Sequence, residues 1–415
     1  MTTVPALAEL NFVVIPLLST SHLIPLADMA KVLAQQGVTV TLVTTVLNAA
    51  RFTAAIDRAI RSGLLIRVVE LQFKGKEAGL PEGCENHNDV PGLNYRRQFF
   101  AAIDMLQEQT EKLLEDMKPK PSCIISDAYV AWTADTADKF QIPRIVFDGM
   151  SCFNQMCKHN MYILKDQNKI PESGTFVIPD LPDRIEVTKA QLPPHFNPAG
   201  TVFIQDIRDK IRAAEKRAYG VVINTFEELE QSYRGNKGSF DKEDILKKWL
   251  DSWEPETVVY AYMFWEPETV VYAYMFWEPW SYYSSTICGA CFRPGSISAG
   301  VPLITWPLFA EQFLNEKLLV HVLKIAAGVG SQAIVHLGEE EKFGAQVSNN
   351  AVTDAIKKVM DKEKEGNKIR KRARELGEMA KRAVEDGGSS HLNVMLLIKE
   401  IQEFQLNQSA KNALV

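Results

Sequence analysis

A chain of 415 residues with 46% hydrophobic and 24% charged residues has the composition of a folded protein with enough apolar material for two or three domains. Its formal net charge is -6, so it lacks the basic excess typical of nucleic-acid-binding proteins, and we expect no such partner. Six cysteines are too few for a disulfide framework in a chain of this length, which predicts reduced thiols and a cytoplasmic location.

The first apolar segment, residues 10–27, contains no Asp, Glu, Lys or Arg and therefore invites comparison with a signal peptide or a membrane helix. A signal peptide requires a basic stretch before the apolar run, whereas residues 1–9 offer only Glu9 as a charged side chain. Pro16 and Pro25 do not suit a membrane-spanning helix. We therefore expect a buried strand, a loop and the start of a helix, with no targeting or transmembrane segment.

The pattern that sets the fold class is a strand, a helix and a second strand in succession. Residues 11–16 form a short apolar run, apolar positions then recur at helical spacing up to Gly37, and residues 38–43 form the next apolar run. Such a unit is typical of a parallel sheet in an α/β protein.

The same alternation continues through the first half of the chain. We expect further strands at 64–71, 123–126, 144–147 and 220–223, and helices at 95–117 and 131–140. Thr225 to Glu228 has the pattern of a capping box and predicts another helix. Polar residues follow, and they indicate a junction to a second domain.

The second half opens with a perfect duplication of twelve residues. Trp253–Phe264 is repeated as Trp265–Phe276, and each copy holds one predicted strand. We expect one copy to form the first strand of a C-terminal sheet and the other to be an added or poorly packed neighbour. A strand at 301–305, a helix at 309–323 and a helical tail over 352–405, with breaks at Gly366 and at 387–390, complete the prediction.

Two short motifs point to other chemistry but lack their context. Residues 328–333 fit the dinucleotide-binding fingerprint, yet they follow a predicted helix and open no clear helix, which favours a turn. Cys288 and Cys291 have the spacing of a metal or redox pair, but no second ligand pair lies near them in the sequence. We therefore expect no metal site. A nicotinamide-dependent oxidoreductase is a more distant alternative, since it would need a glycine-rich turn after the first strand and Leu17–Ser21 contains no glycine.

Five longer motifs resemble the plant secondary-product UDP-glycosyltransferases. The resemblance covers residues 10–230 and 298–404, and its most specific part is the segment Gly300-Val-Pro-Leu-Ile-Thr-Trp-Pro-Leu-Phe-Ala-Glu-Gln312. That segment is similar to the C-terminal end of the family's donor-sugar signature. The other motifs resemble the branch that acts on flavonoids, terpenoids and steroids, and they are Cys123–Asp127 with Trp132, Gly149–Phe153, Leu181–Arg184 and Gly220–Leu229.

The resemblance implies the GT-B fold, in which two Rossmann-like domains with parallel sheets face each other. It implies an acceptor-binding domain at 1–235, a linker at 236–250 and a nucleotide-sugar domain at 251–387. The remaining residues, 388–415, would form a helix that returns to the first domain. We expect a monomer whose C-terminal domain is truncated.

The resemblance also assigns the site residues. His22 would be the general base and Asp127 the carboxylate behind it, while Trp306, Glu311 and Gln312 would contact the donor sugar. Both His22 and Asp127 follow the end of a predicted strand, where parallel sheets bind ligands. Spacing alone favours a helix cap at His22 and a helix start at Asp127, and the resemblance reverses that preference. Gln312 at the last position of the signature implies a preference for glucose.

The implied reaction is inverting transfer of glucose from UDP-glucose, as co-substrate, to a hydroxyl of a small metabolite, with no other cofactor and no metal. The front of the donor signature is absent, however. The strings Trp-Ala-Pro-Gln and His-Cys-Gly-Trp-Asn-Ser, which would hold the nucleotide and its diphosphate, do not occur in the chain. The alternative is a catalytically defective family member that binds acceptor only.

Overall fold

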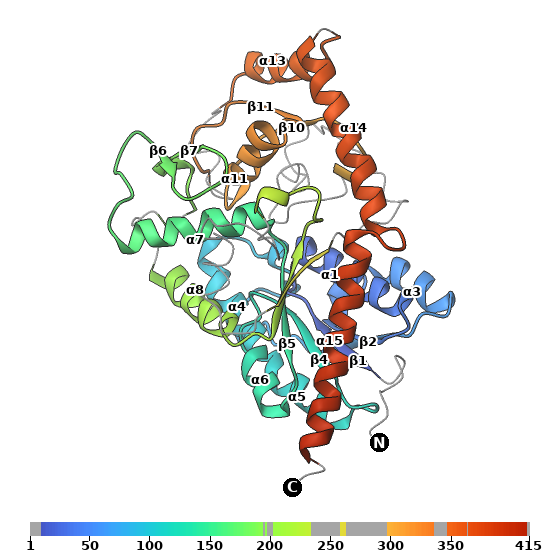
Figure 1. Cartoon of the computed structure of the whole chain (residues 1–415). Coiled ribbons are helices and arrows are strands. Elements are labelled where there is room, and N and C mark those ends of the chain that lie inside the picture. Colours follow the sequence, from blue (N-terminus) through green and yellow to red (C-terminus); the bar gives the residue numbers. More distant parts are fainter. Residues whose placement is uncertain are drawn as a thin grey trace.

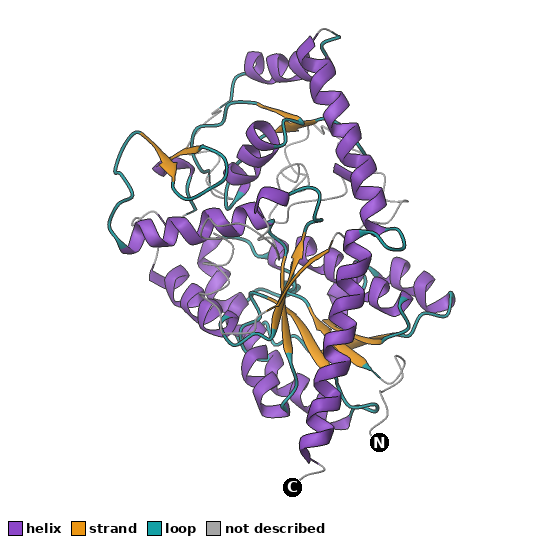
Figure 2. Cartoon of the chain, viewed as in Figure 1, coloured by secondary structure: helices purple, strands orange, loops and turns teal. Residues whose placement is uncertain are grey.

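The computed structural model describes residues 10–193, 196, 202–233, 258–262, 297–335, 347–362 and 364–412. A large part with a central sheet and a smaller part above it make up the molecule in the view of Figure 1. Helices surround the strands of the large part (Figure 2), as predicted for an α/β fold with a parallel sheet.

The central sheet has seven strands in the order β3-β2-β1-β4-β5-β8-β9, and every neighbouring pair is parallel. The strand order reverses between β1 and β4, because the chain proceeds from β1 to β2 and β3 on one side and from β4 to β5 on the other. Open α/β sheets bind their ligands at such a switch point. The strands are β1 (Asn11–Ile15), β2 (Thr39–Thr45), β3 (Ile66–Leu71), β4 (Cys123–Asp127), β5 (Arg144–Asp148), β8 (Gly220–Asn224) and β9 (Val258–Tyr262).

The helices of this part include one correction to the prediction for residues 95–117. Two helices, separated at Met105, replace the single predicted helix. The α-helices are α1 (Thr20–Gln35), α2 (Val46–Ala49), α3 (Thr53–Arg61), α4 (Arg96–Asp104), α5 (Leu106–Asp116), α6 (Thr133–Phe140), α7 (Cys152–Asp166) and α8 (Val202–Glu215). Short 3-10 turns lie at η2 (His87–Asp89), η3 (Leu93–Tyr95), η4 (Lys189–Gln191) and η6 (Gln231–Tyr233).

The predicted capping box at Thr225 is wrong. No α-helix begins there, because the Thr225 hydroxyl donates to the buried carboxylate of Glu230 at 2.5 Å instead of capping a helix. Glu230 also accepts hydrogen bonds from the backbone amides of Cys152 and Phe153, at 3.1 and 2.8 Å. This carboxylate therefore ties the segment after β8 to the start of α7.

The smaller part contains a short parallel pair, β10 (Leu303–Thr305) and β11 (Ala326–Gly328). Between them lie α11 (Gln312–Glu316) and the π-helical segment η8 (Lys317–Val322), which replace the longer helix predicted at 309–323. A hairpin of β6 (Thr175–Ile178) and β7 (Ile185–Thr188) lies nearby in Figure 1. Because β11 ends at Gly328, the fingerprint-like residues follow a strand after all, but no helix begins in 329–335.

Helices α13 (Asn349–Met360), α14 (Lys364–Val384) and α15 (Ser389–Asn412) end the described chain, and α14 runs through the predicted break at Gly366. Helix α14 lies close to the loop that leads into β10. A Cβ atom on Gly377 would stand 2.6 Å from the Cα atom of Gly300, so only glycine fits there. Gly300 itself has φ +68, the left-handed region that favours glycine.

The first copy of the duplication does not start a C-terminal sheet. It supplies β9, which pairs in parallel with β8 at the edge of the seven-stranded sheet. The second copy, Trp265–Phe276, lies outside the described residues, as do Cys288 and Cys291. A strand of this apolar composition fits the edge of either sheet, and pairing with β8 decides its place.

Helix α14 leads from the smaller part towards the large one, and α15 then runs along the central sheet (Figure 1). The α15 side chains Val394, Leu397, Ile398 and Ile401 are buried in the same apolar core as β1 and β4. The Gln405 side chain donates to the backbone carbonyl of Ser122 at 3.0 Å, just before β4. The last described helix thus contributes to the core of the N-terminal part.

Candidate functional site

The structure brings His22 and Asp127 together at the switch point of the central sheet. His22 lies in the first turn of α1, which follows β1, and Asp127 is the last residue of β4. Since β1 and β4 are parallel neighbours, both side chains emerge at the same edge. The His22 Nδ1 atom lies 2.6 Å from Oδ2 of Asp127, and the two side chains are 12% and 1% exposed.

The second oxygen of Asp127 is also engaged. Its Oδ1 accepts a hydrogen bond from the backbone amide of Tyr129 at 2.9 Å, which fixes the orientation of the carboxylate. The Tyr129 ring meets the imidazole of His22 edge-on, with ring centroids 5.9 Å apart. With Nδ1 donating to Asp127, Nε2 of His22 is left as the acceptor of the neutral ring.

The electrostatic surroundings raise the pKa of His22. Burial by itself lowers this pKa, but the charge of Asp127 and the hydrogen bond to it outweigh burial, and Glu311 and Asp148 act in the same direction. The imidazolium form is therefore stabilised, as a group that accepts a proton during a reaction requires.

The two predicted sugar contacts at the start of α11 are buried, and Glu311 interacts electrostatically with His22. Glu311 is 9% exposed, its Oε1 has no hydrogen-bond partner among the described residues, and burial raises its pKa to about 7. Gln312 is fully buried, and its Oε1 accepts from the backbone amides of Leu308 and Phe309 at 2.7 and 3.3 Å. The Nε2 of Gln312 has no partner within the described part of the chain and remains able to donate.

Trp306, the third predicted sugar contact, is 44% exposed and does not join the core. It follows β10 directly and precedes the loop that leads to Glu311 and Gln312 at the start of α11. An exposed indole offers an apolar face to a ligand.

Two sequence comparisons with curated proteins agree closely. UDP-glycosyltransferase 73C3 of Arabidopsis thaliana is 35% identical over 484 aligned positions, which cover 95% of this chain and 97% of the relative. UDP-glycosyltransferase 73C11 of Barbarea vulgaris is also 35% identical, and its alignment covers 96% of this chain and 97% of that relative. No family model matches the sequence.

The chain belongs to the plant UDP-glycosyltransferases. Among solved structures, that of Glycyrrhiza uralensis UGT73P12 with glycyrrhetinic acid 3-O-monoglucuronide is 27% identical, has a TM-score of 0.79 and covers 98% of each chain. Medicago truncatula UGT71G1 with UDP-glucose, at 17% identity and a TM-score of 0.61, shares the fold. The fold is therefore that of the GT-B glycosyltransferases, as the sequence motifs implied.

This glycosyltransferase lacks internal residues that its relatives have. The alignment with UDP-glycosyltransferase 73C3 has 484 positions, whereas 95% of 415 residues is about 394. In about 90 positions the relative thus has a residue and this chain has none. The absence of the donor-signature strings agrees with such internal gaps.

A polar pocket beside the pair was missed by sequence reasoning. It is lined by Tyr129, by Asp148 at the end of β5, and by charged side chains of α7 and α8, namely Lys158, Arg208 and Glu215. Asp148 is the last residue of a strand. The rule that ligands bind at the carboxyl ends of parallel strands, which agreed with Asp127, could therefore have found it. The helix residues carry no such signal, because charged side chains on helices are usually solvated.

No helix within the described ranges is long and apolar enough to cross a membrane. The same residues contain no group of three or more His, Cys, Asp or Glu side chains arranged to hold a metal ion.

Proposed function

We propose that this glycosyltransferase transfers glucose from UDP-glucose to a hydroxyl group of a small plant metabolite of the flavonoid, terpenoid or steroid class, with inversion at the sugar. The observation that carries the proposal is the 2.6 Å contact between His22 and Asp127 at the switch point of the sheet. UDP-glucose is the co-substrate, with no further cofactor, and the protein acts as a cytoplasmic monomer.

In the proposed reaction Nε2 of His22 accepts the proton of the acceptor hydroxyl. The oxygen attacks C1 of glucose, the bond from C1 to the phosphate oxygen breaks, and UDP leaves with the electron pair. Asp127 keeps Nδ1 of His22 protonated and stabilises the imidazolium that forms, as in other pairs of a base and an orienting carboxylate. Buried Glu311 offers an acceptor for the sugar hydroxyls, and Nε2 of Gln312, which has no partner among the described residues, offers a donor.

The acceptor class has support from a relative. The Glycyrrhiza uralensis enzyme was solved with glycyrrhetinic acid 3-O-monoglucuronide, a large polycyclic ligand. We infer that this chain accepts a molecule of comparable size in the large domain.

The second candidate is a family member that binds acceptor and transfers nothing. It is favoured by the missing front of the donor signature and by the internal gap of about 90 positions relative to UDP-glycosyltransferase 73C3. The leaving group carries two phosphates, and nucleotide folds bind such charge with backbone N–H groups at a helix N-terminus.

One experiment separates the two candidates. The purified chain is incubated with UDP-glucose and a panel of flavonoid, terpenoid and steroid alcohols, and glucosides are measured by mass spectrometry. UDP and the acceptors are titrated separately by calorimetry. A glucoside that disappears in His22→Ala supports transfer, whereas acceptor binding without UDP binding or product supports the second candidate. Binding of neither ligand would overturn both.

A further inference from the structure

Helix α1, which carries His22, lacks an N-terminal cap of its own. Its N-cap residue is Ser19, but the Ser19 side chain makes no capping hydrogen bond to the helix, and its first turn contains no acidic residue. The first amide groups of a helix have no partner within the helix, and a missing cap lets the first turn fray. His22 lies in that first turn.

The cap comes instead from a distant loop. The side-chain Oδ1 of Asn88 accepts a hydrogen bond from the backbone amide of Thr20 at 3.1 Å and from the hydroxyl of Ser19 at 3.3 Å. Asn88 therefore performs for α1 the role that an N-cap side chain normally performs, although it is far away in the sequence.

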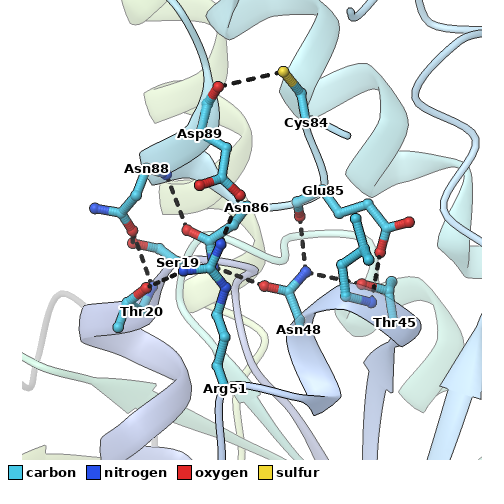
Figure 3. Close-up of polar contacts among 11 residues, drawn as sticks. Ser19, Thr20, Thr45, Asn48, Arg51, Cys84, Glu85, Asn86, Asn88 and Asp89 are labelled. Carbon is cyan, nitrogen blue, oxygen red and sulfur yellow. Dashed lines mark hydrogen bonds and ion pairs between the residues drawn. The ribbon is translucent and has the colours of Figure 1, made fainter. Parts of the chain in front are cut away.

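The loop that presents Asn88 is held in turn by buried amides (Figure 3). The Asn86 side chain accepts from the backbone amide of Asn88 at 2.9 Å and donates to Oδ1 of Asn48 at 2.7 Å. Asn48 donates to Oγ1 of Thr45, at the end of β2, and to the backbone carbonyl of Glu85, at 2.8 and 2.9 Å. Asn48 and Asn86 are 0% and 1% exposed, so loss of either would leave buried polar groups unpaired.

A second arm of the same network ends at the same helix. Arg51 pairs with Asp89 at 2.7 Å, and its other terminal nitrogen donates to the Thr20 hydroxyl at 3.4 Å. The backbone amide of His87 also donates to the carbonyl of Leu18 at 2.7 Å. The residues just before His22 are thus held by Asn88 and His87 from the segment 84–89 and by Arg51, which follows α2.

We propose that Asn88, fixed by Asn86 and Asn48, is a positioning residue for His22 that keeps the first turn of α1 where Nδ1 of His22 meets Asp127. The expected effect of Asn88 on turnover rests on the proposed function of His22. The effect of Asn88 on the His22 imidazole does not depend on turnover, because the contact with Asp127 exists in the protein without substrate.

The test is an NMR titration of His22 in the full chain, compared between wild type, Asn88→Ala and Asn88→Asp. In Asn88→Ala we expect the pKa of His22 to fall towards its ordinary value of about 6.5, because the hydrogen bond to Asp127 loosens. Asn88→Asp keeps an oxygen that accepts from Thr20 and suits a helix N-terminus, so it should retain the raised pKa. Nearby His87 does not obscure the signal, because burial lowers its pKa to about 4.

Ser348→Ala is the matched control. The Ser348 hydroxyl caps α13 by accepting from the amide of Ala351 at 3.2 Å, so this variant also loses one helix cap, but away from His22. Removal of either cap destabilises the helix that it caps. Only Asn88→Ala should shift the titration of His22.

Where the chain shows turnover, Asn88→Ala should lower kcat about 10- to 100-fold with little change in KM, since a displacement of about 1 Å in a reacting group has effects of that size. A shifted titration in a chain without turnover would support the positioning role and count against the proposed function. An unchanged His22 titration in folded Asn88→Ala, or an equal shift in Ser348→Ala, would overturn the inference.

Discussion

The buried carboxyl group of Glu311 and the imidazole of His22 interact electrostatically although they come from opposite halves of the chain. The charge of His22 lowers the pKa of Glu311, and the charge of Glu311 raises that of His22. Burial still dominates at Glu311, whose pKa is raised to about 7. Glu311, expected at the donor sugar, and His22, expected at the acceptor hydroxyl, therefore influence each other's protonation.

Replacement of His22 by alanine should abolish most of any transfer activity. General-base catalysis contributes about 10²- to 10⁴-fold, and we expect kcat to fall by that amount while acceptor binding persists. His391→Ala is the control, because His391 lies in the first turn of α15, away from His22. Among the described residues, it accepts a hydrogen bond from the backbone amide of Gly387 at 3.1 Å and makes a distant contact with Asp386. Equal activity in His22→Ala and wild type would remove His22 from the mechanism.

The activity should rise with pH through a pKa above the ordinary 6.5 of histidine, because His22 must be neutral to accept a proton and its pKa is raised. In Asp127→Asn the rise should move to lower pH, since the charge that raises this pKa is gone. The pair stabilises the fold fully below about pH 6.5, and this stabilisation is lost as the pH rises through the folded pKa. Pre-steady-state rates and denaturant unfolding between pH 5 and 9 measure both effects. Identical pH profiles for wild type and Asp127→Asn would contradict the assignment of His22 and Asp127 as a coupled pair.

Glu311→Gln should remove a pH-dependent loss of stability. A carboxyl group with a folded pKa of about 7 against 4.5 binds more protons when folded, so wild-type stability falls as the pH rises from 4.5 to 7. The upper bound is on the order of 3 kcal/mol. The free energies of unfolding of the two proteins should differ little at pH 4.5, and that of the variant should be the larger at pH 8. A difference that does not change with pH would show that the pKa of Glu311 is not raised in the folded protein.

Under the second candidate function, UDP and UDP-glucose should bind weakly. The two buried groups at the sugar end contribute at most about 1.5–3 kcal/mol each, which does not replace a diphosphate site. We expect a Kd above about 1 mM, since each 1.4 kcal/mol lost weakens binding about tenfold. Calorimetry with UDP and with UDP-glucose measures this, and micromolar affinity would mean that other residues form a diphosphate site.

Gly377→Ala should destabilise the protein, although alanine favours an ordinary helix interior by about 1 kcal/mol over glycine. The added Cβ atom would stand 2.6 Å from the backbone of Gly300, so α14 or the loop before β10 must move. We expect a loss of about 1–3 kcal/mol, seen as a lower thermal midpoint. A thermal midpoint of Gly377→Ala at or above that of wild type would show that the loop before β10 moves at little cost in stability.

Much of the first half could be predicted from the sequence because its signals are local. The apolar run at 11–16 and the helix stop at Gly37 locate β1, α1 and β2 within a few residues. The family resemblance assigned His22 and Asp127 to one site, and the rule that the carboxyl ends of parallel strands share one edge agrees with that location. The direct pairing of β1 with β4, which brings the two side chains into contact, is given by the structure.

The features that sequence reasoning missed depend on tertiary contacts. An apolar strand such as β9 fits either sheet, and its partner β8 decides its place. The capping pattern at Thr225 is overridden because a buried carboxylate, Glu230, takes the hydroxyl. The role of Asn88 has no sequence signature either, because a cap supplied by a distant loop leaves no pattern near the helix that it stabilises.

The course of α15 has a consequence for the order in which the protein folds during synthesis. The N-terminal sheet shares its apolar core with Leu397, Ile398 and Ile401, which are synthesised after every strand of that sheet. Packing of this core is therefore completed only once α15 has been made.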